Sequence, residues 1–273
     1  QVRSQTAPDI KRRFEEAGLV WGAPIFMRFH KYGDKELAKL VQTRNGVPQF
    51  LNFNYQAGSF LEIWVRKDNI SGVHELFEAY PVCVYSGKLG PKKKEGDGQT
   101  PEGFYNLTAG QFNPNSQYRL SVNLGYPNAY DRFRRYTGGS VMVHGYCASI
   151  GCLAMNDKID EVYVILENAV LSGQREIPYH SFPFRMTPEN IQLTAPVLPD
   201  LQAWWSEIRP GWTAFEETRV PPFVSVVNGN YAIERRGSPL APAADAGTSA
   251  AAESVEQSPQ AAAPAQPSTE SQQ

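Results

Sequence analysis

The chain has 273 residues, of which 41% are hydrophobic and 12% aromatic, enough apolar material for one sizeable core or two small ones. Its formal net charge is -2 at pH 7, so electrostatics give no reason to expect a nucleic acid as a partner. No run of the sequence reaches the roughly 18 to 20 apolar residues that a membrane helix needs, so we expect no transmembrane segment in this chain.

The first 22 residues predict a helix that leads into the main domain. Pro8 and Asp9 precede apolar residues at Ile10, Phe14 and Leu19, and basic residues occupy the other face. From residue 24 the apolar period changes to two, which is typical of strands. Strands are expected over residues 25–30, 61–66, 74–85, 103–107, 118–124 and 140–144.

The second half of the chain predicts two helices and a hairpin. Asn156 or Asp157 caps a helix whose apolar residues recur at helical spacing from Ile159 to Ala169. A shorter helix is expected around residues 200–208. Near the end, strands at 224–227 and 231–233 flank Asn-Gly, a strong hairpin signal. These elements predict a mainly β, α+β fold with appended helices.

The composition changes sharply at Gly237. Residues 237–273 are mostly Ala, Pro, Ser, Gln and Glu, with no aromatic residue, no Lys and no Arg. Such a segment cannot bury enough apolar area to offset the entropy of ordering it, so we expect a disordered tail. The tail holds four of the 28 acidic residues, so residues 1–236 carry 26 basic and 24 acidic residues and a net charge of +2.

Residues 141–155 suggest nucleophilic catalysis. An apolar strand ends in His144-Gly145, a turn of small residues follows, and Cys152 stands after Gly151 and before the expected helix. This order favours a cysteine nucleophile with His144 as its base. The dipole of the following helix is expected to favour the thiolate. Gly151 is expected to let a substrate carbonyl approach and to leave backbone N–H groups near Cys152 for an oxyanion.

Two other interpretations fit the same residues. In the first, Cys152 and His144 are simply buried structural residues of a core turn. In the second, His144, Cys147 and Cys152 are three ligands of a zinc ion, which needs a fourth ligand from Cys83, another His or a carboxylate. The spacing alone does not choose among the three.

Two motifs resemble the L,D-transpeptidase catalytic domain family. Residues 149–155, Ser-Ile-Gly-Cys-Leu-Ala-Met, preceded by His144-Gly145, are similar to its signature, and residues 96–105 are similar to its Thr-Pro-x-Gly-x-Phe segment. One branch is more similar, the murein transpeptidase-like proteins that include amidases releasing lipoprotein from peptidoglycan. It is resembled at residues 85–92, 113–116, 123–132 and 225–229. The resemblance spans roughly residues 23–233.

The resemblance implies a β-sandwich or barrel catalytic domain over residues 23–236 that needs no cofactor and no metal. It implies Cys152 as nucleophile, His144 as base and the Gly145 carbonyl as the group that orients the imidazole, with Gly151 at the oxyanion site. Ser149 is expected to shape the turn. The implied substrates are peptidoglycan stem peptides with meso-diaminopimelate.

What receives the acyl group is left open. An amine acceptor gives a transpeptidase, and water gives an amidase that cuts cross-links or releases a peptidoglycan-linked lipoprotein, the further partner that the branch implies. A peptidoglycan-binding protein without catalysis is the third alternative.

The sequence departs from the family signature at two positions. Ile150 stands in place of a His, and Ala154 in place of an Arg. The missing Arg leaves open how substrate carboxylates are held. Other basic residues are candidates to replace it, and the alternative for each of them is that it is only a solvated surface charge. The candidates are Lys88, Lys92, Arg132, Arg134 and Arg135. Tyr126 and Tyr130 are cleft-lining candidates, with a core or surface position as the alternative for each. Residues 38–60 are extra relative to the branch, and either form a structural hairpin or cap the cleft.

A substrate in the cell wall implies an exported, periplasmic enzyme. The chain begins at Gln1 rather than Met, so we expect that an N-terminal segment has been removed, either a secretory signal or a stretch unrelated to export. Three cysteines leave at least one thiol unpaired. In an oxidising periplasm Cys83 can pair with Cys147 and leave Cys152 free. Two buried thiols are the alternative for Cys83 and Cys147.

Overall fold

A five-stranded mixed sheet forms the centre of the computed structural model, which describes residues 2–44, 47–50 and 58–240. The order along the sheet is β5 (His74–Pro81), β4 (Phe60–Arg66), β1 (Ile25–His30), β11 (Ile177–Phe182) and β6 (Gly103–Leu107). β1 and β11 run parallel, and the other neighbours are antiparallel. All six residues of β1 are buried, which fits a central strand that is covered on both faces.

A second, smaller sheet carries the chemically interesting turn. Its order is β10 (Leu153–Ala154), β9 (Met142–His144), β8 (Ser121–Asn123) and β7 (Phe112–Asn113). Short connections with 3-10 turns at Ala109–Gln111 and Asn156–Lys158 flank this sheet. The expected strands at 118–124 and 140–144 are therefore present but shorter than predicted.

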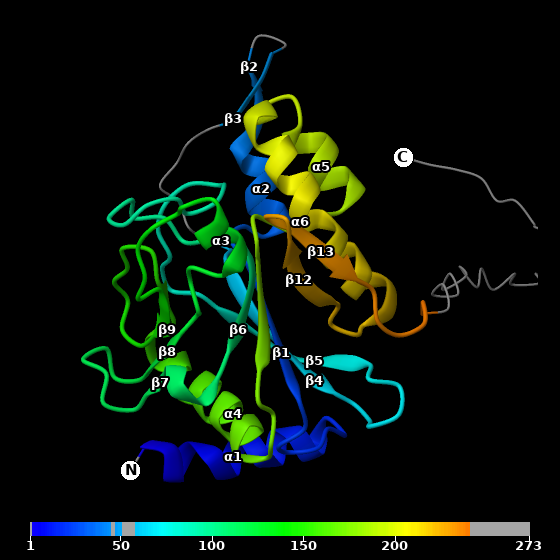
Figure 1. Ribbon diagram of the computed structural model, residues 1–273. Coiled ribbons are helices and arrows are strands. Elements are labelled where there is room, and N and C mark those ends of the chain that lie inside the picture. The colour runs from blue at the N-terminus through cyan, green and yellow to red at the C-terminus, as the bar shows by residue number, and fades with distance from the viewer. Residues whose placement is uncertain (1, 45–46, 51–57, 241–273) are drawn as a thin grey trace, which may run out of the picture. The chain divides into compact units, whose positions relative to one another are not determined.

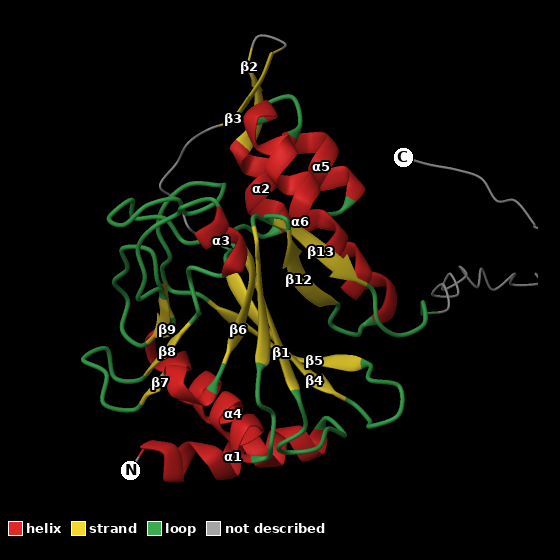
Figure 2. Ribbon diagram, in the orientation of Figure 1, coloured by secondary structure: helices red, strands yellow, loops and turns green. Residues whose placement is uncertain are grey.

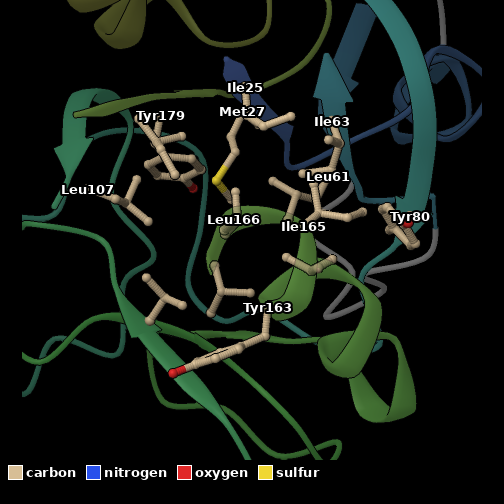
Figure 3. Packing of buried hydrophobic residues seen from close by; sticks show 14 of the residues in the cluster. Ile25, Met27, Leu61, Ile63, Tyr80, Leu107, Tyr163, Ile165, Leu166 and Tyr179 are labelled. Atoms are coloured by element: carbon tan, nitrogen blue, oxygen red, sulfur yellow. The ribbon is translucent and has the colours of Figure 1, made fainter. Parts of the chain in front are cut away.

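The main core lies between the two sheets and two helices. α1 (Val2–Glu16) contacts α4 (Ile159–Leu171), and both helices lie at one end of the molecule in Figure 1. Figure 3 shows side chains of α4, such as Ile165 and Leu166, pointing toward Met27 and Ile63 of the central sheet. The same cluster includes Val143 of the second sheet. This sandwich-like packing with helices confirms the predicted α+β class.

The opposite face of the central sheet is covered by the C-terminal elements. Figure 2 shows α6 (Pro199–Thr218) beside the β12–β13 hairpin, with α2 (Asp34–Leu40) and α5 (Pro188–Thr194) nearby. The hairpin pairs Phe223–Val227 with Asn230–Glu234, as its Asn-Gly turn predicted. A second aromatic cluster built on Trp205, Phe182 and Phe184 fills this side. α3 (Ala129–Phe133) completes the set of described helices.

Several predictions fall partly outside the described residues. Residues 241–273 of the expected tail are outside the described residues, and so are residues 45–46 and 51–57 of the extra stretch 38–60. Within that stretch, β2 (Val41–Arg44) pairs antiparallel with β3 (Val47–Phe50), the arrangement of a hairpin. Residues up to Leu240 form one unit, and the domain boundaries at 22 and 236 stay predictions. Among the described helices, none is long and apolar enough to cross a membrane.

Candidate active site

The candidate nucleophile and base come from two paired strands of the second sheet. β9 ends at His144 and β10 begins directly after Cys152, and the two strands run parallel with Val143 beside Leu153. Val143 and Leu153 point into the main core, and successive side chains of a strand alternate between its faces. The side chains of Cys152 and His144 therefore both point away from the core, toward the same face.

His144 is held in one orientation and one tautomer. Its side chain is 2% exposed, and Nδ1 lies 2.6 Å from the carbonyl oxygen of Gly145. Because a carbonyl oxygen only accepts, Nδ1 carries the proton, and Nε2 of the neutral ring is left to accept one. Burial lowers the pKa of His144 below its ordinary value, and the Gly145 carbonyl opposes this shift. The ring of Tyr118 packs over the imidazole with 4.6 Å between centroids.

Gly145 is required by close packing. Its N–H donates to the carbonyl of Tyr118 at 3.0 Å, and a Cβ at this position would lie 2.7 Å from the same oxygen and 3.0 Å from the Ile159 side chain. The neighbouring Arg119 pairs with Asp160 of α4 through two nitrogens. The loop that packs against His144 is thus fastened to the core helix.

Cys152 is the free cysteine of the described residues and is partly buried. The N–H of Met142 donates to Sγ at 3.4 Å, and Sγ contacts the carbonyl oxygen of Ser140 at 3.6 Å. Burial raises the pKa of the Cys152 thiol, while the Met142 N–H and the charge of Lys92 lower it. Together with the lowered pKa of His144, this favours a thiol and a neutral imidazole at rest.

The helix expected after Cys152 is present as α4, which begins close to its predicted caps Asn156 and Asp157 but does not follow Cys152 directly. Residues 153–154 form β10, a 3-10 turn follows, and α4 begins only at Ile159. The pairing of β10 with β9 accounts for the delay, because two residues that extend along a parallel neighbour cannot also start a helix. Because α4 does not directly follow Cys152, the sequence argument for a dipole effect of this helix on the thiol does not apply.

The turn before Cys152 is built by the Ser149 hydroxyl, as expected. Ser149 Oγ accepts from the Gly151 N–H at 3.2 Å and donates to the Cys152 carbonyl at 2.7 Å. Gly151 has a φ of +118°, in the range that favours glycine. Its N–H, an expected oxyanion donor, is directed to Ser149 in this structure. The remaining backbone candidate for that role is the N–H of Cys152.

Thr100 connects the second motif to this turn, a role that the sequence did not reveal. Its buried hydroxyl donates to the Gly151 carbonyl at 3.0 Å. A Cβ on Gly151 would lie 3.2 Å from the carbonyl oxygen of Gln99, so the two segments touch along their backbones. The Thr-Pro-x-Gly resemblance included Thr100 without assigning it a contact. Tyr118 carried no sequence signal for its position over His144.

Glu102, in the same motif, anchors the segment to the second aromatic cluster. Its carboxylate is 3.0 Å from the Lys31 ammonium, and both side chains are fully buried. The indole N–H groups of Trp204 and Trp205 donate to its other oxygen at 2.9 and 3.2 Å. The Lys31 ammonium also donates to the carbonyl of Gly90. A buried charge needs such partners, so this network fixes the loop that leads to Thr100.

Comparison with known proteins shows a likeness to one family. Residues 60–177 match the family model YkuD, described as the L,D-transpeptidase catalytic domain. This segment is therefore similar to L,D-transpeptidase catalytic domains. YafK of Escherichia coli K12, named as a candidate L,D-transpeptidase, is 43% identical over 163 residues, which cover 59% of this chain and 65% of YafK. The same values hold for YafK of E. coli O157:H7. The chain therefore matches just under two thirds of these relatives.

Two solved structures are more distant. The helical cell shape determining protein Pgp2 from Campylobacter jejuni is 18% identical, with a TM-score of 0.38, over 77% of this chain and 66% of Pgp2. Bd1075 of Bdellovibrio bacteriovorus is 16% identical, with a TM-score of 0.33, over 72% of this chain and 61% of Bd1075.

Buried Ala154 stands where the resemblance implies an Arg, and among the candidate substitutes Lys92 is the one whose charge acts on the Cys152 thiol. Its ammonium is almost fully buried, pairs with Asp97 and lies 5.7 Å from the ring centroid of Tyr126. Lys92 is therefore no solvated surface charge. Lys88 is exposed. Tyr126 is 4% exposed and donates to the carbonyls of Lys92 and Thr137, so it packs beneath this loop.

The remaining substrate candidates lie elsewhere. Tyr130 is buried in the second aromatic cluster, where its ring stacks on Tyr231 at 4.4 Å, so it takes the core position that was the alternative to the cleft. Arg134 lies over the Tyr130 ring at 4.3 Å. Arg132 and Arg135 are exposed, and Arg132 donates to the carbonyl of Pro127.

The structure joins Cys83 and Cys147 in a disulfide, with 5.6 Å between their Cα atoms. The bridge ties the turn after His144 to the segment that pairs with Ala154. A cysteine in a disulfide has no thiolate to offer, so the zinc site with Cys147 as ligand is not formed here. Within the described ranges, no group of three or more His, Cys, Asp or Glu side chains is arranged to hold a metal.

Proposed function

We propose that this protein is a periplasmic cysteine acyl-transfer enzyme acting on peptidoglycan stem peptides that contain meso-diaminopimelate. The observation that carries the proposal is that Cys152 and His144 point to one face of two paired strands, with His144 Nδ1 committed to the Gly145 carbonyl. That arrangement leaves Nε2 as the base for a thiol. The likeness of residues 60–177 to L,D-transpeptidase catalytic domains supports the substrate class.

The proposed reaction begins from the neutral pair. Nε2 of His144 takes the Sγ proton as the thiolate attacks the carbonyl carbon at the L-centre of diaminopimelate, and an S–C bond forms. The Cys152 N–H donates to the developing oxyanion. The C–N bond then breaks, the amine leaves with the proton from His144, and a thioester on Cys152 remains.

The second half of the proposed reaction resolves the thioester. An acceptor amine loses a proton to His144 and attacks the thioester carbonyl, which forms an amide and returns the proton to the Cys152 sulfur. Water in the same position gives a free carboxylate instead, so the enzyme then acts as an amidase. Both outcomes use the same residues, and the shape of the acceptor side of the cleft decides between them.

Mass spectrometry of intact protein tests the proposal. Purified protein is mixed with cross-linked muropeptides or with muropeptides that carry a lipoprotein fragment. We expect an acyl adduct on the peptide with Cys152, and no adduct in Cys152→Ala or His144→Ala. New amide products identify transfer, and free acids identify hydrolysis. Muropeptide binding without any adduct, unchanged in Cys152→Ala, would favour a non-catalytic binding protein and overturn the proposal.

A further inference from the structure

A groove of about 750 Å³ lies between the β12–β13 hairpin and the central sheet. Neither Cys152 nor His144 lines it. Its floor is the sheet face that bears Phe104 and His180, and its walls include the turn at Ala129 and the β12 strand. Figure 1 shows β12 and β13 on the side of the sheet where α6 lies, away from β9. The groove is thus a second concave surface, separate from the candidate active site.

The strand β12 presents an edge to this groove. Four consecutive residues, 223–226, line it, and consecutive side chains of a strand point to opposite faces, so the backbone edge itself must face the groove. In the hairpin, Val227 and Asn230 flank the two-residue turn, which makes residues 227, 225 and 223 the ones that bond to β13. The N–H and C=O groups of Val224 and Val226 then point to the other side. Among the described strands, β12 pairs only with β13.

The groove also has uncompensated positive charge. Arg66, Arg132 and Arg236 line it, with Glu176 as the acidic residue among the lining side chains. Within the described part of the chain, no carboxylate forms an ion pair with any of these three guanidinium groups. Other arginines, such as Arg28 and Arg219, do form ion pairs with a glutamate. Arg66 donates to the amide of Asn69 and Arg132 to a backbone carbonyl, so neither charge is neutralised.

Two buried polar atoms at this surface have no partner among the described residues. His180 is 2% exposed, and its Nδ1 makes no hydrogen bond. The Nε atom of Arg66 is also buried without an acceptor. Buried polar atoms are nearly always hydrogen-bonded in folded proteins, so the lining of the groove at Arg66 and His180 is polar but incompletely bonded.

We propose that the groove binds an extended peptide that carries carboxylates, and that this peptide adds to β12 as a third strand. The free N–H and C=O groups of Val224 and Val226 pair with the peptide backbone. The guanidinium groups of Arg132 and Arg236 bind its carboxylates. The proposal does not depend on the chemistry of Cys152, and each can fail without the other.

Fluorescence anisotropy tests the proposal with two labelled hexapeptides, (Val-Glu)3 and (Val-Lys)3. We expect (Val-Glu)3 to bind at least about tenfold more tightly, with an affinity that falls as salt is added. Charge reversal in Arg132→Glu with Arg236→Glu is expected to invert this preference. Equal binding of the two peptides, or a preference unchanged by the reversal, would overturn the proposal.

A matched pair of variants tests the strand pairing. Val226→Pro removes one N–H on the free edge and leaves the bonds to β13, while Val226→Ile keeps the N–H. We expect about a tenfold loss of (Val-Glu)3 affinity for the first variant alone. Unchanged affinity in folded Val226→Pro, or full displacement of the peptide by inorganic phosphate, would identify a simple anion site and overturn the proposal. Circular dichroism checks that each variant is folded. If Val226→Pro is unfolded, the peptide preference of the Arg132→Glu, Arg236→Glu variant tests the proposal instead. Alkylation of Cys152 is expected to be unchanged in all variants.

Discussion

The absence of a side chain at Gly145 lets the backbone next to His144, the proposed base, pack closely against its neighbours. A Cβ on residue 145 would lie 2.7 Å from the carbonyl oxygen of Tyr118. This oxygen belongs to the backbone segment that Arg119 ties to α4. We predict that Gly145→Ala costs about 1–3 kcal/mol of unfolding free energy, the range for overpacking a core. It should also slow acylation, because His144 is displaced.

Gly139→Ala is the matched control for Gly145→Ala. A Cβ on Gly139 meets nothing within 4 Å, so this variant should change the unfolding free energy by less than about 0.5 kcal/mol. Urea unfolding of both variants measures the difference. Equal effects at the two positions would contradict the packing argument.

The reactivity of Cys152 should depend on pH in a defined direction. Burial disfavours the charged form of each group, so it raises the pKa of the thiol and lowers that of His144. We predict that the rate of iodoacetamide labelling still rises with pH above pH 9. Lys92→Met should slow labelling at a given pH, because the Lys92 charge favours the thiolate.

Lys88→Met provides the control, since Lys88 is an exposed cation of the same loop region. A labelling rate that levels off between pH 6 and 7 would instead indicate a thiolate–imidazolium pair at rest, and would contradict the prediction.

Between elements, the contact of Thr100 with Gly151 joins the loop before β6 to the turn before β10. We predict that Thr100→Val, which keeps the shape but removes the donor, costs about 1–3 kcal/mol because a buried carbonyl loses its partner. Labelling of Cys152 should change as well, since the turn loses its support. Thr213→Val, at a half-buried position of α6, is the control for urea unfolding. A Thr100→Val variant as stable as this control would show that Gly151 finds another donor.

Local patterns predicted those elements that have a clear apolar period or a turn signal of their own. The helix at α1, strands β4 and β6 and the Asn-Gly hairpin all follow from period or turn residues. β11 was missed because it is buried on nearly every side and contains Pro178. The predicted helix at 200–208 continues to Thr218 through Pro210, which propensity alone argues against.

Long-range contacts limited the prediction of the site. The sequence identified the residues of the His144 and Cys152 turn, but it did not indicate the short strand β10 between Cys152 and the helix, because parallel pairing leaves no local periodicity. It also left Tyr130 open between the cleft and a core or surface position, and the structure stacks Tyr130 on Tyr231, a residue about one hundred positions later. The roles of Thr100 and Tyr118 depend on such contacts too, and no pattern within either segment indicates them.

For the whole molecule, buried histidines should make the fold sensitive to acid. Burial lowers the pKa of His30 to about 3, of His74 to about 4 and of His180 to about 3. In the unfolded chain these groups take up protons near pH 6.5. The unfolded state then binds more protons, so stability is present above about pH 6.5 and is lost as pH falls toward these values. Asp131, whose pKa burial raises to about 6, opposes part of this loss.

We predict that His30→Phe makes the unfolding free energy less dependent on pH, by about 1.4 kcal/mol per pH unit between pH 6 and 4. Both ring nitrogens of His30 lack a partner among the described residues, and its ring packs against Phe60 and Phe182, so an apolar ring loses no hydrogen bond. Urea titrations at several pH values provide the test, and parallel curves for the variant and the original protein would contradict it.

The bridge between Cys83 and Cys147 acts on the unfolded chain as well as on the folded one. It joins positions 64 residues apart, and closing a loop of that length lowers the entropy of the unfolded state by an amount equivalent to about 4 kcal/mol in the chain-entropy model. The loop includes Thr100, Glu102 and His144, but it ends before Cys152. Reduction would release this restraint. A molecule folded in a reducing compartment would therefore be less stable and would carry three thiols in place of one.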